Sequence, residues 1–326
     1  MTKPRILQIL SMYHENGEHI LQENATVVKT NTTDTNHLCN LVQDVSGIIL
    51  RAPARINKEI IDASTNLRAI SGAGIGLDNI DVEAATEKGI AVLHAPNVSA
   101  VSTAEHALSL MMALSKSIIP FHQEMRKANF MSRDSIKTYE IKGKVVGLIG
   151  FGNIAQELAS RLTFGLKMKV IAWVRSIDRN KELIATQLNV ELSTNIETLI
   201  SKSDFISIHV PLNKETKHLI DQRLLSLMKT SAYLINTARG AIIDNKALID
   251  SLVKRKIAGA ALDVFDPEPP LETLELLKLP NVILTPHVGG TTVECNVITS
   301  MTIATNLIRF LNGKPVDTIV NPEVLS

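Results

Sequence analysis

The sequence is short of aromatic residues and carries almost no net charge, and both shortages narrow the choice of partner. Its 326 residues include one Trp, three Tyr and seven Phe, so aromatic residues make up 3%. The formal net charge is +1 at neutral pH. Proteins that bind single-stranded nucleic acid combine a strongly basic groove with aromatic stacking platforms. This composition therefore disfavours nucleic acid, and equally an anionic membrane surface, as a partner.

Cysteine and long apolar runs are also scarce. The two cysteines, Cys39 and Cys295, lie far apart and predict separate thiols rather than a disulfide. The nine histidines have no carboxylate or thiol at ligand spacing, so we expect no metal site. No run approaches the roughly 18 apolar residues of a membrane span. The apolar part of segment 1–10 is too short for a signal peptide. Together these features predict a cytoplasmic protein.

Short apolar strands alternate with helical segments along most of the chain. A length of 326 residues favours two domains over one. Alternating strands and helices form parallel sheets with right-handed crossovers, so we expect an α/β fold with a flavodoxin-like first domain. Strands are expected there at 5–10, 25–28, 47–50, 67–70 and 90–93, and helices at 15–23, 36–44, 58–64 and 82–88.

The segment Lys144–Ala159 has the pattern of a dinucleotide-binding turn. Its apolar run predicts a strand buried on both faces, and two glycines then lead into a helical pattern. Gly150 suits a tight turn and Gly152 a close approach of the backbone to a ligand, while Ala155 replaces the third glycine of the fingerprint. The helix N-terminus favours a pyrophosphate. The alternative is an ordinary strand-to-helix turn without a ligand.

A second sheet is expected around this turn, and six or more mostly parallel strands predict a doubly wound Rossmann domain. Further strands are expected at 169–173, 189–192, 204–209, 232–236, 259–262 and 281–284. A long apolar helix at 102–127 should precede this domain, and a final helix at 292–311 should return to the first one. The predicted domains are thus residues 1–98 with 290–326, and residues 99–289.

Polar side chains follow the last three of these strands at their carboxyl ends, where ligands bind in open parallel sheets. They are Arg239, Glu268 and His287. Taken singly, each has an ordinary explanation as a surface or loop residue. Together they fit the reduction of a 2-oxo acid, because a guanidinium binds a carboxylate through two hydrogen bonds and a histidine can give a proton to a carbonyl oxygen.

Several long motifs resemble those of the D-isomer-specific 2-hydroxyacid dehydrogenases. The resemblance covers nearly the whole chain in order. It implies an enzyme that transfers a hydride between a nicotinamide dinucleotide and a small 2-oxo acid, with residues 1–98 and 290–326 as the substrate-binding domain. The motifs are AGIGLDNIDV at 73–82, NVSAVSTAEHAL at 97–108, GLIGFGNIAQ at 147–156, NTARG at 236–240, DVFDPEP at 263–269 and TPHVGG at 285–290.

The resemblance also implies roles for single residues. Arg239 would bind the substrate carboxylate and polarise the carbonyl, and His287 would be the acid/base with Glu268 as its partner. Backbone N–H groups of the first domain would bind the same carboxylate. They belong to Ala73, Gly74, Ile75 and Gly76.

The same resemblance places the cofactor. Gly150, Gly152, Asn153 and Ile154 would hold the pyrophosphate. Residues on the adenosine and ribose side would be His209, Val210, Pro211, Thr216, Thr237 and Ala238. Residues near the nicotinamide would be Thr103, Asp263 and Gly289. Members of the family are usually dimeric, so a homodimer is expected.

The end of the strand 169–173 decides which nicotinamide cofactor is expected. An acidic residue there would bind the adenosine ribose 2′-hydroxyl, but Val174 occupies that place. Arg175 and Ser176 follow and could receive a 2′-phosphate, whereas Asp178 lies too far along. The sequence therefore favours NADP(H), with NAD(H) possible through the pyrophosphate alone.

Three interpretations of the substrate and activity follow from the sequence. Arg51 resembles the arginine that phosphoglycerate dehydrogenases use for the substrate phosphate, which suggests 3-phosphoglycerate or 3-phosphohydroxypyruvate. Family members that use NADPH are more often glyoxylate or hydroxypyruvate reductases. A third alternative is a corepressor-like protein that binds a dinucleotide without significant turnover. A broad D-2-hydroxyacid dehydrogenase is the preferred interpretation.

Overall fold

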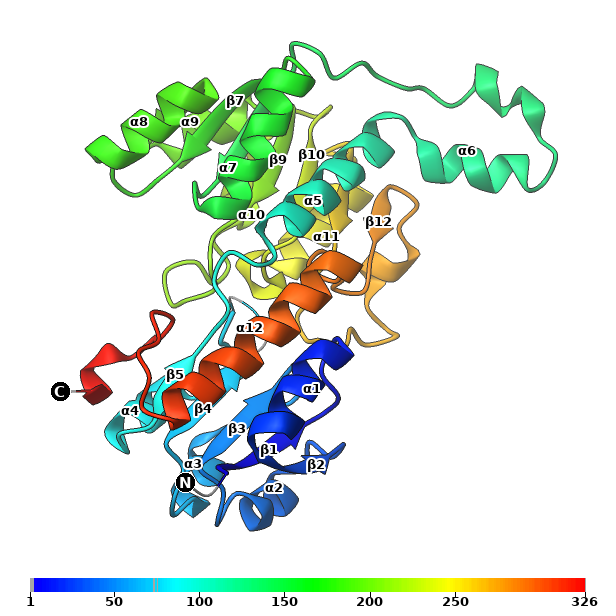
Figure 1. The fold of residues 1–326 in the computed structure, drawn as a ribbon. Coiled ribbons are helices and arrows are strands. Elements are labelled where there is room, and N and C mark those ends of the chain that lie inside the picture. Colours follow the sequence, from blue (N-terminus) through cyan, green and yellow to red (C-terminus); the bar gives the residue numbers. More distant parts are fainter. Residues whose placement is uncertain (1–2, 73, 75, 326) are drawn as a thin grey trace. The chain divides into compact units, whose positions relative to one another are not determined.

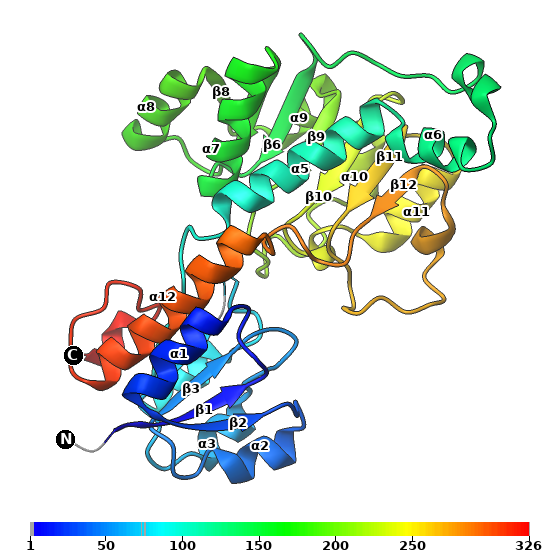
Figure 2. The ribbon, with the colours of Figure 1, turned by 45° about the vertical axis from the view of Figure 1, so that its right-hand side comes forward.

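The protein, described here by a computed structural model, divides into two compact units. The structure describes residues 3–72, 74 and 76–325. One unit is Met1–Ser99 with Thr291–Ser326 and the other is Ala100–Gly290. Each boundary lies one residue beyond the predicted one. Each unit is a parallel sheet between helices, as Figures 1 and 2 show, which confirms the predicted α/β fold.

The first unit contains a five-stranded sheet in the order β2-β1-β3-β4-β5. All its pairs are parallel. This order is that of flavodoxin. The strands are β1 (Arg5–Ile9), β2 (Thr26–Thr30), β3 (Gly47–Leu50), β4 (Ala69–Gly72) and β5 (Ala91–Leu93).

Both faces of this sheet are apolar because its side chains alternate between two cores. In β3, Ile48 and Leu50 pack into one core and Ile49 into the other. Helices α1 (Glu15–Asn24) and α12 (Val293–Leu311) lie side by side over the face of Ile49 (Figures 1 and 2). Those over the opposite face are α2 (Thr35–Leu41), α3 (Lys58–Ala63) and α4 (Val82–Glu87). The chain ends in a 3₁₀ turn, η5 (Pro322–Leu325).

The second unit contains a seven-stranded sheet in the order β12-β11-β10-β9-β6-β7-β8. All its pairs are parallel. The order reverses between β6 and β9, which is the switch point of a Rossmann fold. The strands are β6 (Val145–Ile149), β7 (Lys169–Trp173), β8 (Val190–Ser193), β9 (Phe205–Ile208), β10 (Tyr233–Asn236), β11 (Gly259–Leu262) and β12 (Val282–Leu284).

Helices cover both faces of this sheet too. On one face lie α5 (Ala100–Ser115), α7 (Asn153–Ser160) and α8 (Arg179–Leu188). On the other lie α9 (Ile196–Lys202), α10 (Gln222–Ser226) and α11 (Asn245–Val253). Helix α6 (Ile118–Met125) buries none of its residues. Shorter turns are η1 (Phe130–Asp134), a π-turn η2 (Arg161–Gly165), η3 (Gly240–Ile242) and η4 (Glu275–Lys278).

Side-chain caps explain where most helices begin. An Asp or Asn side chain accepts a hydrogen bond from a backbone N–H of the first turn, which satisfies one donor that the helix leaves unpaired. Helix α7 differs, because its N-cap is Gly152, which has no side chain to accept such a bond. The Asp and Asn capping residues are Asp34, Asn57, Asp81, Asp178, Asn195, Asp221 and Asp244. In the same way, the side chain of His14 caps α1 and that of Thr292 caps α12.

The predicted helix 102–127 is wrong as a single element, because it breaks into α5 and α6. Ser117 stands between them in a left-handed conformation, with φ 49°. Pro120 supplies the physical reason. It has no N–H to donate to the carbonyl of Lys116, and its ring would clash with that carbonyl in a continuous helix. In the first turn of α6 the proline is tolerated.

Neither cysteine of the chain takes part in a disulfide. Cys39 and Cys295 are both free thiols. Among the helices in the described part of the chain, none is long and apolar enough to cross a membrane.

Candidate active site

The turn after β6 is built around Gly150. Its φ is 102°, a conformation that side-chain-bearing residues rarely adopt. A Cβ here would also lie 2.7 Å from the carbonyl oxygen of His209. The turn therefore packs against the loop that follows β9, at the switch point of the sheet. Ala155 lies fully buried between α7 and the sheet, in the packing role of the third fingerprint glycine.

Two further observations fit a dinucleotide at this edge of the sheet. A Cβ on Gly152 would meet no described atom within 4 Å, although its backbone is ordinary, with φ −78°. Packing within the chain therefore does not require glycine there, whereas a closely approaching ligand would. The hydroxyl of Thr237, at the end of β10, is buried without a hydrogen-bond partner among the described residues. Asn153 and Ile154 form the first turn of α7.

Arg175, just after β7, pairs with an acidic residue from the loop that follows β9. Val174 is buried in the core and offers no polar atom. Arg175 is exposed and forms an ion pair with Glu215, which is also exposed. The carboxylate of Asp178 caps α8 by accepting a hydrogen bond from the N–H of Lys181. Ser176 is exposed. The sequence did not predict a role for Glu215, because this residue is far from Arg175 in sequence and lies on the loop that follows β9.

That loop follows β9 and is internally braced. Thr216 is buried, and its hydroxyl donates to the carbonyl oxygen of Pro211 at 2.6 Å. The side-chain oxygen of Asn213 accepts from the N–H of Glu215 at 2.9 Å, which fixes that residue. His209 lies at the start of the loop, 2.8 Å from the hydroxyl of Ser207 through Nε2. Burial lowers the pKa of His209 to about 4, so its ring is neutral near pH 7.

The neighbours of His209 and Thr237 complete the predicted adenosine side. Val210 is partly buried against the core and Pro211 is exposed. Ala238 is partly buried after β10. Their contacts with a cofactor remain predictions.

Arg239 is placed by tight packing between the loops after β10 and β11. A Cβ on Gly240 would lie 2.0 Å from the carbonyl carbon of Phe265, so only glycine permits this approach. The buried side chain of Asn236 shapes the turn by donating to the carbonyl oxygen of Arg239 at 2.9 Å. The guanidinium of Arg239 donates to the carbonyl oxygen of Ala238 at 2.7 Å.

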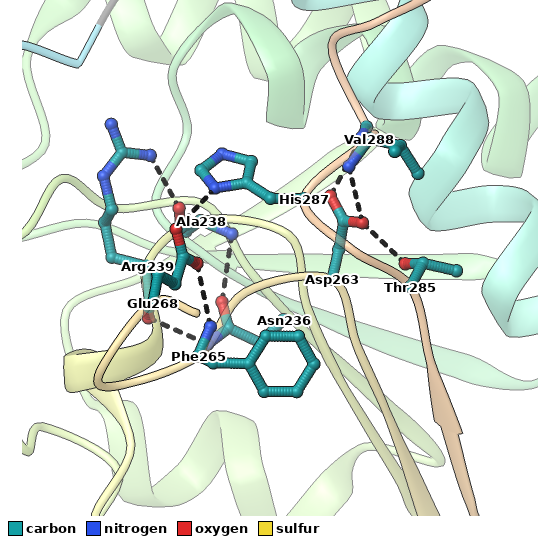
Figure 3. A network of polar contacts seen from close by, with 10 residues as sticks. Asn236, Ala238, Arg239, Asp263, Phe265, Glu268, Thr285, His287 and Val288 are labelled. Atoms are coloured by element: carbon teal, nitrogen blue, oxygen red, sulfur yellow. Dashed lines mark hydrogen bonds and ion pairs between the residues drawn. The ribbon is translucent and has the colours of Figure 1, made fainter. Parts of the chain in front are cut away.

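His287 and Glu268 form a hydrogen-bonded pair. Nδ1 of His287 lies 2.9 Å from Oε2 of Glu268, and Oε1 accepts from the N–H of Phe265 at 2.9 Å. Figure 3 shows Arg239 beside this pair, so the three side chains come together from loops that follow β10, β11 and β12.

The charge of Glu268 is set by its surroundings. Burial raises the pKa of the Glu268 carboxyl, but the hydrogen bonds from His287 and Phe265 and the charge of Arg239 outweigh it. The pKa therefore lies below its ordinary value and the group is ionised at neutral pH. An ionised carboxylate can only accept, so Nδ1 of His287 carries a proton and Nε2 is left for proton exchange.

Asp263 anchors the loop that carries His287. Its carboxylate is buried and accepts from the N–H groups of Val288 and Gly289, each at 2.9 Å. Burial raises the pKa of Asp263, but donations from His106, Thr285 and these N–H groups lower it below its ordinary value. Thr103 lies close by, because its Cγ2 would be 3.6 Å from a Cβ on Gly289.

The predicted substrate residues lie in the first unit. The Arg51 guanidinium donates to the carbonyl oxygens of Ser11 at 2.6 Å and Ala52 at 3.1 Å, and lies 5.2 Å from the centre of the Tyr13 ring. Gly74 has φ 131° and Gly76 is partly buried. Ala73 and Ile75 fall outside the described residues. The substrate contacts of all of them remain predictions.

Across residues 3–72, 74 and 76–325, no group of three His, Cys, Asp or Glu could hold a metal ion.

Comparison with known proteins supports the resemblance. A model of the D-isomer-specific 2-hydroxyacid dehydrogenase NAD-binding domain matches residues 108–289. The hydroxypyruvate reductase of Thermotoga maritima is 42% identical over 264 residues, which are 80% of this chain and 83% of that protein. The D-3-phosphoglycerate dehydrogenase of Methanocaldococcus jannaschii is 37% identical over 94% of this chain, which spans only 58% of that longer protein.

A solved structure shares the fold over almost its full length. It is the NADPH-dependent glyoxylate/hydroxypyruvate reductase of Sinorhizobium meliloti in complex with NADP and malonate. The TM-score is 0.88 and the identity 26%, with 98% of this chain and 97% of that chain covered.

Proposed function

Since the chain belongs to the D-isomer-specific 2-hydroxyacid dehydrogenase family, we propose that it is an NAD(P)-dependent reductase of small 2-oxo acids. The observation that carries this proposal is the pair of His287 and Glu268 beside Arg239, at the edge of a Rossmann sheet. That arrangement offers a proton donor and a carboxylate receptor next to the site where the fold binds dinucleotides.

Each of the three side chains has a separate task in this proposal. Arg239 binds the substrate carboxylate and, through its charge, polarises the adjacent carbonyl. His287 gives the proton on Nε2 to the carbonyl oxygen, and takes it back in the reverse direction. Glu268 holds the imidazole by its Nδ1–H and stabilises the imidazolium. A bound nicotinamide dinucleotide would supply the hydride.

The cofactor would lie across the switch point. Gly150, Gly152 and the first turn of α7 would receive the pyrophosphate. The buried hydroxyl of Thr237 would bond to a ribose or an amide of the cofactor. We propose NADP(H) as the preferred form, because Arg175 lies at the end of β7 and Val174 replaces the acidic residue that NAD(H) favours.

For the first unit we propose substrate binding, through Arg51 and the backbone of the segment 73–76. The guanidinium of Arg51 is held by two carbonyl oxygens, which use two of its five N–H groups. The Tyr13 side chain interacts with the same guanidinium, whose positive charge suits an anionic group on the substrate tail. Glyoxylate has no such tail, whereas 3-phosphohydroxypyruvate has a phosphate and hydroxypyruvate a hydroxyl.

We further propose a homodimer held by the α6–η1 segment, which we call the arm (residues 118–134). Figures 1 and 2 show it extending away from the rest of the second unit. Its exposed apolar side chains suit a partner surface of the same kind. They are Ile118, Ile119, Met125, Phe130 and Met131, each at least 42% exposed.

The proposed function is tested by a panel of 2-oxo acids against both reduced nicotinamides. We expect turnover of glyoxylate, hydroxypyruvate or 3-phosphohydroxypyruvate, with a lower KM for NADPH than for NADH. A strong preference for the phosphorylated acid would favour the phosphate role of Arg51. Dinucleotide binding without turnover of any acid would contradict the proposal and favour a corepressor-like binding protein.

A further inference from the structure

The backbone at His287 is held in an uncommon conformation. Its φ is 53°, in the left-handed region that non-glycine residues rarely occupy. Such a conformation persists only where surrounding contacts determine it. The N–H of His287 donates to the backbone carbonyl oxygens of Asp263 at 2.7 Å and Thr285 at 3.1 Å. The next two N–H groups donate to the Asp263 carboxylate. Asp263 therefore fixes the backbone around His287 and with it the direction in which the imidazole side chain points.

The Asp263 carboxylate is in turn held from the side of α5. Its Oδ1 accepts from the hydroxyl of Thr285 at 2.6 Å. Nε2 of His106 lies 3.0 Å from that hydroxyl and 3.3 Å from Oδ1. A hydroxyl has one proton, and the short contact to the carboxylate uses it. Thr285 must therefore accept from His106, so Nε2 of His106 carries a proton.

This chain of contacts joins the two segments that enter and leave the second unit. Helix α5 begins at Ala100, the first residue of the second unit, and carries His106. Gly289 precedes the last residue of that unit, Gly290. A Cβ on Gly289 would lie 3.0 Å from Oδ2 of Asp263 and 3.5 Å from Cδ2 of His106. One buried carboxylate thus links the second turn of α5 to the loop of His287.

We propose that His106 is a positioning residue for His287, acting through Thr285 and Asp263. It does not touch the reacting atoms. Its N–H fixes the rotamer of Thr285 and the orientation of the carboxylate, and these set the place of the imidazole. The inference rests on the proposed function for the role of His287, but the contacts that it describes exist without substrate.

The first test compares turnover in matched variants. His106→Leu removes the donor, whereas His106→Gln keeps an N–H at nearly the same reach. We expect His106→Leu to lower kcat by about tenfold or more, since small misplacements of catalytic groups are costly. The KM for the cofactor should stay within about twofold, and His106→Gln should recover most of kcat. Ser109→Ala, an exposed position on the same helix, is the control.

A double-mutant cycle separates positioning from general damage. Thr285→Val should lower kcat about as much as His106→Leu, and the double variant should be little worse than either, because both changes break one chain. Equal loss in His106→Gln and His106→Leu, or independent losses that multiply in the double variant, would overturn the proposal. Should His106→Leu not fold, His106→Asn, which is too short to reach Thr285, takes its place.

The second test needs no turnover and so separates this inference from the proposed function. Amide hydrogen exchange is measured at Val288 and Gly289 in the full chain. We expect it to be at least about fivefold faster in His106→Leu than in the wild type, and near the wild-type rate in His106→Gln and Ser109→Ala. Unchanged exchange in His106→Leu would overturn the proposal even if the enzyme is active. Faster exchange in a chain that reduces no acid would uphold it while the proposed function fails.

Discussion

Single residues at the candidate site owe their charge and orientation to their neighbours. Glu268 stays ionised because His287, the Phe265 N–H and Arg239 outweigh the cost of its burial. His209 stays neutral because burial lowers its pKa to about 4, so it contributes no positive charge for a phosphate at neutral pH. Arg175 is the charged group at the end of β7, but Glu215 pairs with it. Under the proposed NADP(H) preference, Arg175 and Glu215 are therefore the two residues to test.

Glu215→Gln should strengthen the preference for NADPH. The carboxylate of Glu215 pairs with Arg175, so it would compete with a 2′-phosphate for that guanidinium and would repel the phosphate. Exposed pairs contribute up to about 1 kcal/mol, so we expect the KM for NADPH to fall about two- to fivefold while the KM for NADH changes less than about twofold. Steady-state kinetics with both cofactors check this.

The matched control is Glu197→Gln, which removes an equally exposed pair with Arg223. It should change neither KM. A rise in the KM for NADPH in Glu215→Gln would show that Glu215 helps to orient Arg175 for the phosphate, contrary to this account.

At the scale of secondary-structure elements, the site is a set of loops at one edge of a parallel sheet. Strands β10, β11 and β12 are neighbours, so their carboxyl ends bring Arg239, Glu268 and His287 together although they are far apart in sequence. The approach between the first two loops is possible only because residue 240 has no side chain.

Gly240→Ala should therefore damage both stability and activity. The added Cβ has no space beside the backbone of Phe265 and must push the two loops apart. We expect a loss of about 1–3 kcal/mol in the free energy of unfolding, together with a large fall in kcat. Chemical denaturation and steady-state kinetics measure the two effects.

Gly165→Ala is the control, since a Cβ there would meet no atom of the described chain within 4 Å. It should change stability by less than about 0.5 kcal/mol. An equally mild effect of Gly240→Ala would mean that the two loops are not held together as described.

Most elements could be predicted from the sequence, because their signals are local. Apolar runs such as Gly47–Leu50 locate strands, and capping residues such as Asp221 locate helix starts. The break at Ser117 was missed although Pro120 signals it, because the apolar pattern continues across it. The pairing of Arg175 with Glu215 could not be predicted, since it depends on how two separate loops fold over the sheet.

In the candidate site, too, some residues could be predicted from the sequence and others could not. Motifs and strand ends predicted Arg239, Glu268 and His287, because parallel strands bring their carboxyl ends to one edge. The sequence gives no sign that His106 touches Thr285 and Asp263, since that contact depends on the packing of α5 beside the sheet.

At the scale of the whole molecule, the two units contain parallel sheets with different strand orders. The Rossmann order of the second unit places the proposed cofactor site at the switch point between β6 and β9, and the flavodoxin order of the first unit has its own switch point, where Arg51 follows β3. The arm of the second unit buries none of the residues of its helix α6, which is unusual for a helix with apolar side chains.

The protein should sediment as a dimer of twice the 35.6 kDa chain mass. Phe130→Glu should shift it toward the monomer, because the change places a charge among apolar side chains that would cover each other in the proposed dimer. Leu183→Glu, on α8 and similarly exposed, should leave the dimer intact. A monomer in the wild type at micromolar concentration, measured by sedimentation velocity, would contradict the assignment of the arm.

The most direct measurement of the central claim is turnover by His287→Asn. Asparagine tolerates the left-handed conformation of this position but cannot exchange a proton, so the change isolates the chemistry from the backbone. We expect kcat to fall about 10²- to 10⁴-fold while the Kd for NADPH stays within about threefold, with His37→Asn, exposed on α2, unchanged in both. Turnover in His287→Asn close to that of the wild type would contradict the account.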